Sequence, residues 1–585
     1  MRRAIGVVLF FLLAAGCGGA GSPAASITPE GFPPETPRLA AHVRAVRERF
    51  DPERARATVA FVDQFFRVRG NEGYQASLAR VREELRGRGG FEESAVRTLE
   101  LGEVRPTWTP RSAELVLVAE DGSETPLVSF ATEQERDRAA LLVGSSATER
   151  TTLEVVRAER VREGEPAQGR LVLAEGEPRP LYREVVEGGV EGGGAAGILV
   201  RNLEAYHQAE RFPESAQFGY LRPNDVDPSR HAIGFSLSDR AWRALRAATE
   251  DGVARVRVRV DVATGSSAAT AIEARIDGSD PSAGAIVLAT HVDEPGANDN
   301  ASGVAALVEL AGALRRAIEE GAVARPRRAL VFVWGQEIEV SGAWLDQASE
   351  PVAAGLVMDM VGQDPEATGA PFLIERMPDP GAVWLRGPDV HSEWGSSEVD
   401  PTTLRGHFLN DWLRAGIARV ASAEGIAWTA RAHPFEGGSD HVSFLRRELP
   451  AVLAWHFTDD AYHTTRDRLE RVSGEEMRRV AALLGGAALS MASGERADRE
   501  EMLSVVRAAA IERLGWAGDA GRAEIARGGD RALEQRIVRE WARWYDQAIG
   551  SIAAWDGDDP VMRAALTDAR GAVAARARDV ERALE

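Results

Sequence analysis

The sequence predicts an α/β protein built on a doubly wound, mostly parallel sheet that is flanked by helices. Between residues 263 and 495, short continuous apolar runs alternate with helical patterns, as expected of strands that are buried on both faces. The four runs are Ala285–Ala289, Ala329–Trp334, Gly355–Met358 and Ala451–Trp455. Val304, Leu307 and Leu314 recur at helical spacing and predict a helix between the first two strands.

The rest of the chain divides into units with different patterns. Residues 38–112 carry helical periodicity and are assigned to the N-terminal part of the main domain. Residues 113–262 change to short β-like runs between Gly-rich turns, which predicts a smaller, β-rich inserted domain. Residues 496–585 have a helical pattern, with an apolar stripe between Leu533 and Ile552. We interpret this stripe as the core of a helical extension, with a partner or dimer surface as the alternative.

The N-terminus has the pattern of an export signal. Two arginines precede an apolar run from Ile5 to Ala15, which is too short to span a bilayer comfortably. The run ends in Leu-Ala-Ala-Gly-Cys17, which resembles a bacterial lipoprotein cleavage box with Cys17 as the lipidated residue, and residues 18–37 resemble a flexible tether. We therefore expect an exported cell-envelope lipoprotein that is anchored in a membrane through Cys17. An ordinary signal with a chance cysteine is the alternative.

Charge and cysteine content exclude some classes of function. The net charge of −20 argues against a nucleic-acid partner, because phosphate binding needs a basic face. Cys17 is the single cysteine, so the chain can form no internal disulfide and no cysteine-ligated zinc site.

Five residues of metal-ligating types follow one another in contexts that suit ligation: His291, Asp299, Glu337, Asp359 and His463. They fall at or after the carboxyl ends of predicted strands, where a doubly wound sheet places its site. Two imidazoles and three carboxylates, one of them bridging, can hold two zinc ions about 3.5–4 Å apart. Asp299 alone would also suit a helix N-cap.

The motifs around these residues resemble one family in their order along the chain. They are His291-Val-Asp293, Gly296-Ala-Asn-Asp-Asn-Ala-Ser-Gly303, Asp359-Met-Val-Gly362, Ser439-Asp440-His441 and Tyr462-His463-Thr464. The family is that of the co-catalytic zinc aminopeptidases and carboxypeptidases, which also holds glutamate carboxypeptidase, the transferrin receptor and glutaminyl cyclase. The resemblance implies the zinc exopeptidase fold, and residues 113–262 resemble the protease-associated domain that is often inserted in it.

The resemblance also implies a role for each site residue. One zinc ion would be held by His291, Asp299 and Asp359, and the other by Asp299, Glu337 and His463. Asp293 would orient the imidazole of His291 from its far side. Four further residues are expected beside the metals or the substrate: Ser439, Asp440, His441 and Tyr462.

One position departs from the family pattern. After the strand that corresponds to Ala329–Trp334, family members have Gly-Glu-Glu, with the first Glu as general base. This chain has Gly335-Gln336-Glu337 there. Gln336 thus stands at the base position and Glu337 keeps the ligand role. A shifted alignment, with Glu337 as base and Glu339 as ligand, is the alternative. An amide cannot take a proton from water, and loss of a general base typically costs roughly 10²–10⁴ in rate.

The favoured function is a zinc-dependent exopeptidase, an aminopeptidase that hydrolyses peptides at the cell envelope with zinc-bound hydroxide as the nucleophile. Its activity is expected to be reduced by Gln336. Two alternatives follow from the same residues. One is a catalytically weak or inactive peptidase-like protein that binds peptides, and the other is an acyltransferase that resembles glutaminyl cyclase. The oligomeric state is not assigned.

Overall fold

The computed structural model describes residues 32–132, 134–188, 194–221, 231–553, 555 and 559–585. The predicted export signal, Cys17 and most of the predicted tether lie outside these residues. Within the described part, the helices are all too short or too polar to cross a membrane.

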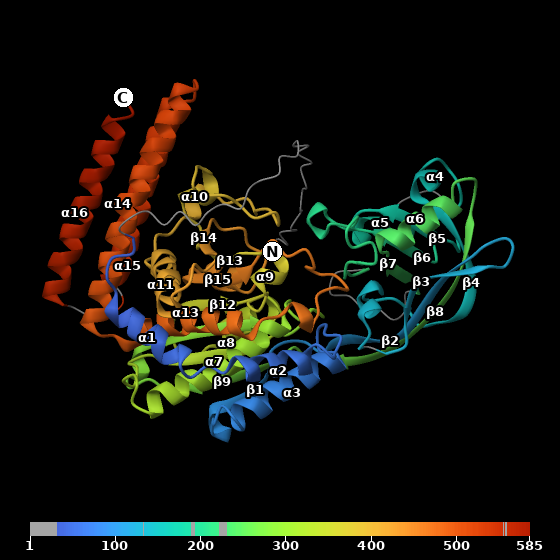
Figure 1. Cartoon of the computed structure of the whole chain (residues 1–585), viewed down its shortest axis with the longest axis horizontal. Coiled ribbons are helices and arrows are strands. Elements are labelled where there is room, and N and C mark those ends of the chain that lie inside the picture. Colours follow the sequence, from blue (N-terminus) through green and yellow to red (C-terminus); the bar gives the residue numbers. More distant parts are fainter. Residues whose placement is uncertain (1–31, 133, 189–193, 222–230, 554, 556–558) are drawn as a thin grey trace, which may run out of the picture.

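An eight-stranded sheet lies at the centre of the main domain, in the order β1-β9-β11-β10-β12-β15-β13-β14 (Figure 1). Its strands are β1 (Val96–Glu100), β9 (Thr270–Ile276), β10 (Ala285–His291), β11 (Ala329–Gly335), β12 (Val352–Met358), β13 (Phe372–Glu375), β14 (Ala430–His433) and β15 (Ala451–His456). The four central strands β11, β10, β12 and β15 are parallel. Antiparallel pairs join β9 to β11 and β13 to β15. The predicted mostly parallel sheet is confirmed, and antiparallel strands extend it on both sides.

Helices cover both faces of this sheet. One face carries α1 (Pro37–Arg47), α2 (Pro52–Val62), α3 (Glu72–Arg86), α7 (Ala301–Glu319), α11 (Leu409–Glu424) and α13 (Gly474–Ser493). The other face carries α8 (Glu339–Gln347) and α12 (His441–Leu445). Successive residues of β10 alternate between the two layers: Ile286 belongs to the core under α7, whereas Val287 belongs to the core under Trp344 and Phe444. A strand buried in this way must be apolar throughout, which is why the continuous runs predicted these strands.

A second sheet, at one end of the molecule, forms the inserted domain (Figure 1). Its order is β3-β2-β8-β4-β5-β6-β7. The strands are β2 (Arg105–Val118), β3 (Glu124–Phe130), β4 (Thr148–Arg157), β5 (Leu171–Glu175), β6 (Gly197–Arg201), β7 (Ile233–Ser236) and β8 (Ala254–Ser267), and the helices are α4 (Ala158–Arg162), α5 (Pro178–Val185) and α6 (Asp239–Ala248). The sheet begins before residue 113 and ends after residue 262, because β2 and β8 continue as a paired ribbon toward the main domain.

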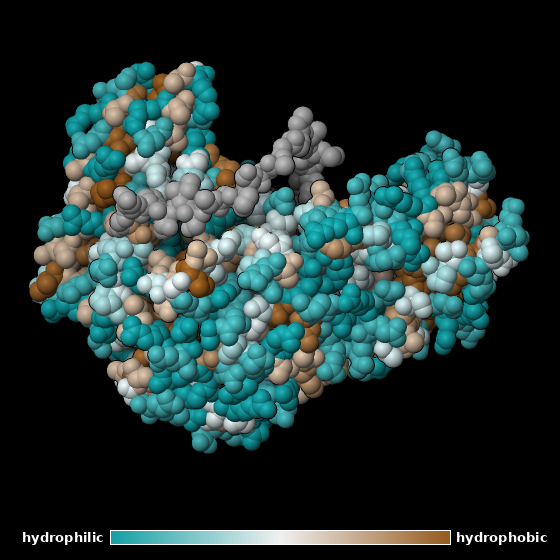
Figure 2. Space-filling model, in the orientation of Figure 1, coloured by the Kyte–Doolittle hydropathy of each residue, from teal (hydrophilic) through white to brown (hydrophobic). Residues whose placement is uncertain are grey.

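Three long helices form the C-terminal extension at the opposite end of the molecule (Figure 1). They are α14 (Arg496–Ala526), α15 (Arg531–Ala553) and α16 (Pro560–Arg582). Ile537, Trp541, Trp544 and Ile549 of the predicted stripe are buried in the same core as the main domain. The face seen in Figure 2 is mostly hydrophilic, with hydrophobic residues scattered over the extension. The stripe therefore packs the extension onto the main domain. The shorter helices α9 (Pro365–Thr368) and α10 (Pro380–Val383) complete the fold.

Asp411 lies on the buried side of α11 and is 6% exposed. Its Oδ2 has no hydrogen-bond partner among the described residues. Burial raises its pKa to about 7, although Arg414 and Arg513 oppose the shift. Because the folded-state pKa lies above the unfolded value, the stability that this carboxyl contributes is complete below about pH 4 and is lost as the pH rises through 7.

The variant Asp411→Asn is therefore expected to be more stable than the wild type at pH 8, by roughly 2–4 kcal/mol, and to differ little from it at pH 4. Urea unfolding at both pH values checks this expectation. An equal change at the two pH values would show that folding does not raise the pKa of this carboxyl.

Candidate metal centre

The five predicted ligands meet at one edge of the sheet. His291 is the last residue of β10, Glu337 follows β11 by two residues, and Asp359 directly follows β12. His463 lies in the loop after β15, and Asp299 lies just before α7. Since β10, β11, β12 and β15 are parallel, their carboxyl ends share an edge, and the loops that follow them converge.

His291 faces two carboxylates with its Nε2 atom. That nitrogen is 3.1 Å from Oδ1 of Asp359 and 3.9 Å from Oδ1 of Asp299. The Nδ1–H of His291 donates to the main-chain oxygen of Asp293 at 3.2 Å, which leaves the lone pair of Nε2 for the centre. This tautomer is the one that a metal-ligating histidine needs.

His463 faces a second pair of carboxylates. Its Nε2 is 2.8 Å from Oε2 of Glu294 and 3.0 Å from Oδ2 of Asp299. The ring of Tyr462 stacks on the imidazole, with centroids 3.9 Å apart. Asp299 therefore directs one oxygen toward each histidine, which is the arrangement expected of a bridging carboxylate.

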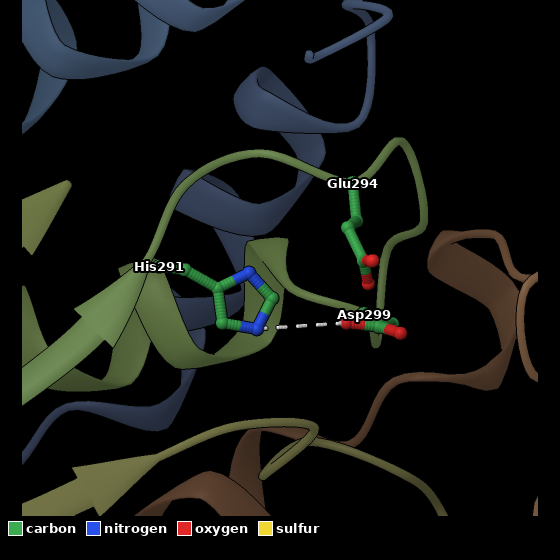
Figure 3. Close-up of side chains that lie close together, drawn as sticks. All are labelled: His291, Glu294 and Asp299. Carbon is green, nitrogen blue, oxygen red and sulfur yellow. Dashed lines mark ion pairs between the residues drawn. The ribbon is translucent and has the colours of Figure 1, made fainter. Parts of the chain in front are cut away.

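Glu294 is the residue of the centre that sequence analysis missed. It groups with His291 and Asp299, with one candidate ligand atom from each residue within 4.8 Å of the others. Figure 3 shows its carboxylate directed toward Asp299. No motif singled it out, although it directly follows the His291-Val-Asp293 motif. Glu337, which the resemblance assigned to the zinc ion of His463, instead groups with His291 and Asp359.

Asp293 lies beside the centre, on the Nδ1 side of the His291 imidazole. Its carboxylate is 3.9 Å from Nδ1 of His291, and its main-chain oxygen is the acceptor for that nitrogen. The carboxylate oxygen Oδ1 accepts the backbone N–H of Glu337 at 2.9 Å. Asp293 thus positions His291 through its backbone and Glu337 through its side chain.

Two residues of the Ser439-Asp440-His441 motif support the centre. Ser439 donates its hydroxyl to Oδ2 of Asp359 at 2.8 Å. Asp440 accepts the backbone N–H of Ile338 at 2.6 Å and so fixes the turn that follows Glu337. His441 instead pairs with Glu375, at 2.8 Å between Nε2 and Oε1, and both side chains are fully buried.

Gln336 and Glu339, which flank Glu337 where the chain departs from the family pattern, lie in different surroundings. Gln336 is 7% exposed, and its Oε1 has no hydrogen-bond partner within the described ranges. Glu339 forms ion pairs with Arg69 and Arg105, at 3.4 Å and 3.3 Å. These pairs direct Glu339 toward arginine and support the ungapped register, in which Glu337 supplies the ligand.

A further acidic residue, Asp467, holds the loop that carries Asp299. Its two carboxylate oxygens accept the backbone N–H groups of Asn298 and Asp299, at 2.7 Å and 2.8 Å. Asn300 caps α7 by accepting the N–H of Gly303. No sequence motif singled out Asp467, because hydrogen bonds between distant loops leave no periodic signal.

Strained backbone is concentrated around the centre. Glu294, Ile338, Met360 and His463 have φ values of 75°, 59°, 52° and 54°. Each is a site residue or the direct neighbour of one. Positive φ in residues other than glycine costs of order 1–3 kcal/mol and persists only where surrounding contacts impose it. The contacts of Asp293, Asp440 and Asp467 are of this kind.

The inserted domain contacts the loop that carries His463. The backbone N–H of Phe218 donates to the main-chain oxygen of His463, and Gln217 forms a β-bridge with Thr464. His207 donates its Nε2–H to the main-chain oxygen of Tyr462 at 2.9 Å. A cavity at this junction is lined by residues of both domains, among them Ala139, Phe218, Asp299 and His463. The inserted domain therefore borders the centre and positions one of its histidines.

The residues present fit zinc. Nε2 of His291, Oδ1 of Asp299 and Oδ1 of Asp359 are buried without a hydrogen-bond partner among the described residues. Burial, together with the negative charge of Asp299, raises the pKa of Glu294 to about 7. Burial and neighbouring carboxylates raise the pKa of Glu337 well above its usual value. Carboxylates crowded in this way repel unless cations lie between them, and imidazole and carboxylate are ligands that zinc accepts.

Comparisons with known proteins find a family match over the part of the chain that forms the centre. Residues 272–488 match the model of Peptidase family M28. The matched M28 segment contains all five predicted ligands and Glu294, and it excludes the inserted domain and the helical extension. A comparison with curated proteins finds no match.

Three solved structures resemble this chain to different degrees. A peptidase M28 precursor from Shewanella amazonensis SB2B has a TM-score of 0.52 at 17% identity, covering 78% of this chain and 97% of that chain. A zinc aminopeptidase from Bacillus subtilis has a TM-score of 0.49 at 16% identity, covering 77% and 97%. A glutaminyl cyclase from an Acidobacteriales bacterium has a TM-score of 0.34 at 12% identity, covering 75% and 94%. At these identities the first likeness supports the fold, and the other two carry no argument.

Proposed function

We propose that the protein is a zinc-dependent aminopeptidase. The observation that carries this proposal is the convergence of His291, His463 and the carboxylates of Asp299, Glu337 and Asp359 at the carboxyl edge of the sheet. When bound there, two zinc ions would activate a water molecule and polarise the scissile carbonyl group. The M28 match over the same residues supports peptide-bond hydrolysis as the reaction.

The charge of the centre favours a free amine over a free carboxylate as the substrate's end group. Besides the predicted carboxylate ligands, the buried side chains of Asp293 and Asp440 and the partly exposed side chain of Glu294 lie around the centre. These carboxylates at least balance the charge of two zinc ions. A terminal ammonium group would therefore be attracted and a terminal carboxylate repelled, which supports an aminopeptidase rather than a carboxypeptidase.

Other residues of the chain would position the ligands, and one position that could supply a general base lacks it. Ser439 holds the carboxylate of Asp359, and Asp293 and Asp440 hold the turn around Glu337. Gln336 stands where a carboxylate would move a proton from water to the leaving amine, and its amide cannot do so. We infer that this missing base lowers turnover while leaving the ligand set intact.

Gln336 also favours a second candidate function, that of a peptide-binding protein that retains its metals without turnover. Its buried amide is the single observation for this candidate. The intact ligand set supports the peptidase instead, because binding alone does not need an activated water molecule.

The test is hydrolysis of a panel of aminoacyl chromophores by the full-length protein with added zinc. We expect measurable release of free amino acids, abolished by chelator, and a fall of at least about 100-fold in the variant His291→Ala, since even outer partners of metal ligands contribute 10–100-fold. Glu339→Gln is the matched control and should keep wild-type activity, because the Glu339 carboxylate pairs with Arg69 and Arg105 and does not group with the candidate ligands.

Three other results would count against the proposal. Equal activity in His291→Ala and the wild type would exclude a metallopeptidase. Peptide binding without turnover would favour the binding protein. Release of pyroglutamyl peptides would favour a cyclase.

We also propose that the protein acts at the cell envelope, anchored through Cys17, and that the inserted domain is of the protease-associated kind. The apolar run that ends at Cys17 and the resemblance of residues 113–262 support these proposals.

A further inference from the structure

The centre consists of two halves that share Asp299. In one half, Nε2 of His291 lies 3.1 Å from Asp359. In the other half, Nε2 of His463 lies 2.8 Å from Glu294 and 3.0 Å from Asp299. The half around His463 therefore has a carboxylate that the family resemblance did not supply.

The position of Glu294 is imposed by its loop. Its φ of 75° turns the backbone directly after Asp293, and Figure 3 shows the side chain descending from this turn toward Asp299. The side chain of Glu294 is 15% exposed, so it is largely removed from water. A side chain held in a strained and largely buried position is typical of a functional constraint.

A simple ion pair with His463 does not account for this arrangement. Glu294 and Asp299 both approach the same Nε2 atom, and two carboxylates brought together beside one imidazole repel each other. Asp299 is 3% exposed and its Oδ1 has no hydrogen-bond partner in the described part of the chain. The same holds for Nε2 of His291, which is 1% exposed and faces Asp299 in Figure 3. Unpartnered atoms directed into one space indicate a cation between them.

We propose that Glu294 is a ligand of the metal ion held by His463 and Asp299, and that Glu337 belongs to the other ion, held by His291, Asp299 and Asp359. The chain thereby holds one carboxylate ligand more than the resemblance implies. Zinc accepts such carboxylate oxygens, and additional oxygen ligands also suit Mn²⁺. This inference rests on the proposed metal centre but does not depend on peptidase activity.

Metal binding, measured without substrate, tests the proposal. The full-length protein is stripped of metal, and zinc is titrated in competition with a chromophoric chelator. We expect two zinc ions in the wild type, and in Glu294→Gln one of the two to bind at least about 10-fold more weakly. Glu339→Gln is the control for removal of a nearby carboxylate and should bind as the wild type does.

Double variants show which ion Glu294 binds. Adding Glu294→Gln to His463→Ala is expected to cause no further loss, because that site is already lost, whereas adding it to Asp359→Asn should weaken both ions. Glu337→Gln should cause no further loss when it is added to Asp359→Asn, and it should weaken both ions when it is added to His463→Ala. Wild-type affinity for both ions in Glu294→Gln, or non-additivity of Glu337→Gln with His463→Ala, would overturn the proposal.

A second variant, Glu294→Asp, keeps the test valid if Glu294→Gln does not fold. Glu294→Asp keeps the charge and shortens the side chain, so it should fold and still bind one ion more weakly if the carboxylate reaches the metal. Unchanged affinity in Glu294→Asp and Glu294→Gln together would contradict the inference. If zinc binds to the wild type and the variants as expected but no substrate is hydrolysed, only the aminopeptidase function is contradicted. If substrate is hydrolysed but both zinc ions bind to Glu294→Gln and Glu294→Asp with wild-type affinity, only the role of Glu294 is contradicted.

Discussion

The variant Gln336→Glu is expected to raise the turnover of aminoacyl substrates by roughly 10²–10⁴-fold, with little change in KM. The position follows β11 directly and precedes Glu337, whose carboxylate belongs to the candidate metal centre. A carboxylate there can accept a proton from the attacking water and pass it to the leaving amine, which the amide cannot do. Because this transfer occurs only in the transition state, its gain belongs in kcat.

Steady-state kinetics of wild type and variant, over the same substrate panel, measure this gain. Gln336→Met is the matched control, because it keeps a side chain of similar length without a carboxylate, and it should be no faster than the wild type. A wild type as active as Gln336→Glu would show that the native enzyme obtains its base elsewhere. An inactive wild type with an active Gln336→Glu would indicate that the natural role is binding.

The variant Asp389→Ala is expected to destabilise the protein by about 3–5 kcal/mol. Asp389 accepts hydrogen bonds from Arg376 at 2.9 Å and from Arg513 of α14 at 2.7 Å. All three side chains are buried, and the two guanidinium groups hold the pKa of Asp389 below its usual range despite its burial. Removing the carboxylate leaves two buried cations facing each other, with Asp379 beside Arg376 as the remaining counter-charge.

Urea unfolding at neutral pH measures this loss. Asp346→Asn is the control, because its ion pair with Arg447 lies at the surface and should contribute almost nothing. We expect the loss to be accompanied by protease cleavage in the helical extension, since Arg513 attaches α14 to the loop after β13. A stability equal to that of the control would show that the network is dispensable.

The central strands could be predicted from the sequence because each is buried on both faces. Such strands need continuous apolar runs, and β10, β11, β12 and β15 all have them. The antiparallel strand β9 escaped prediction, since Glu273 interrupts its apolar pattern and pairs with Arg97 of β1. The parallel ends of the central strands also explain why ligands far apart in sequence could be placed at one edge.

The assignment of ligands to the two halves could not be obtained in the same way. Glu294 and Glu337 each follow a motif residue, and local sequence does not determine which histidine either carboxylate approaches. That choice depends on the turn at Glu294 and on the hydrogen bond from the N–H of Glu337 to Asp293. Asp467 likewise acts through hydrogen bonds between loops. Contacts of this kind become visible only in three dimensions.

The hydrogen bond from Phe218 to His463 has a consequence for the order in which the protein is assembled during synthesis. His291, Glu294, Asp299, Glu337 and Asp359 leave the ribosome well before His463 does. The inserted domain precedes all of them in the sequence, and its hydrogen bond to the backbone of His463 can form only once that last loop has been made. Contacts so distant in sequence form late in folding. A chain truncated before His463 would hold only the half of the centre around His291.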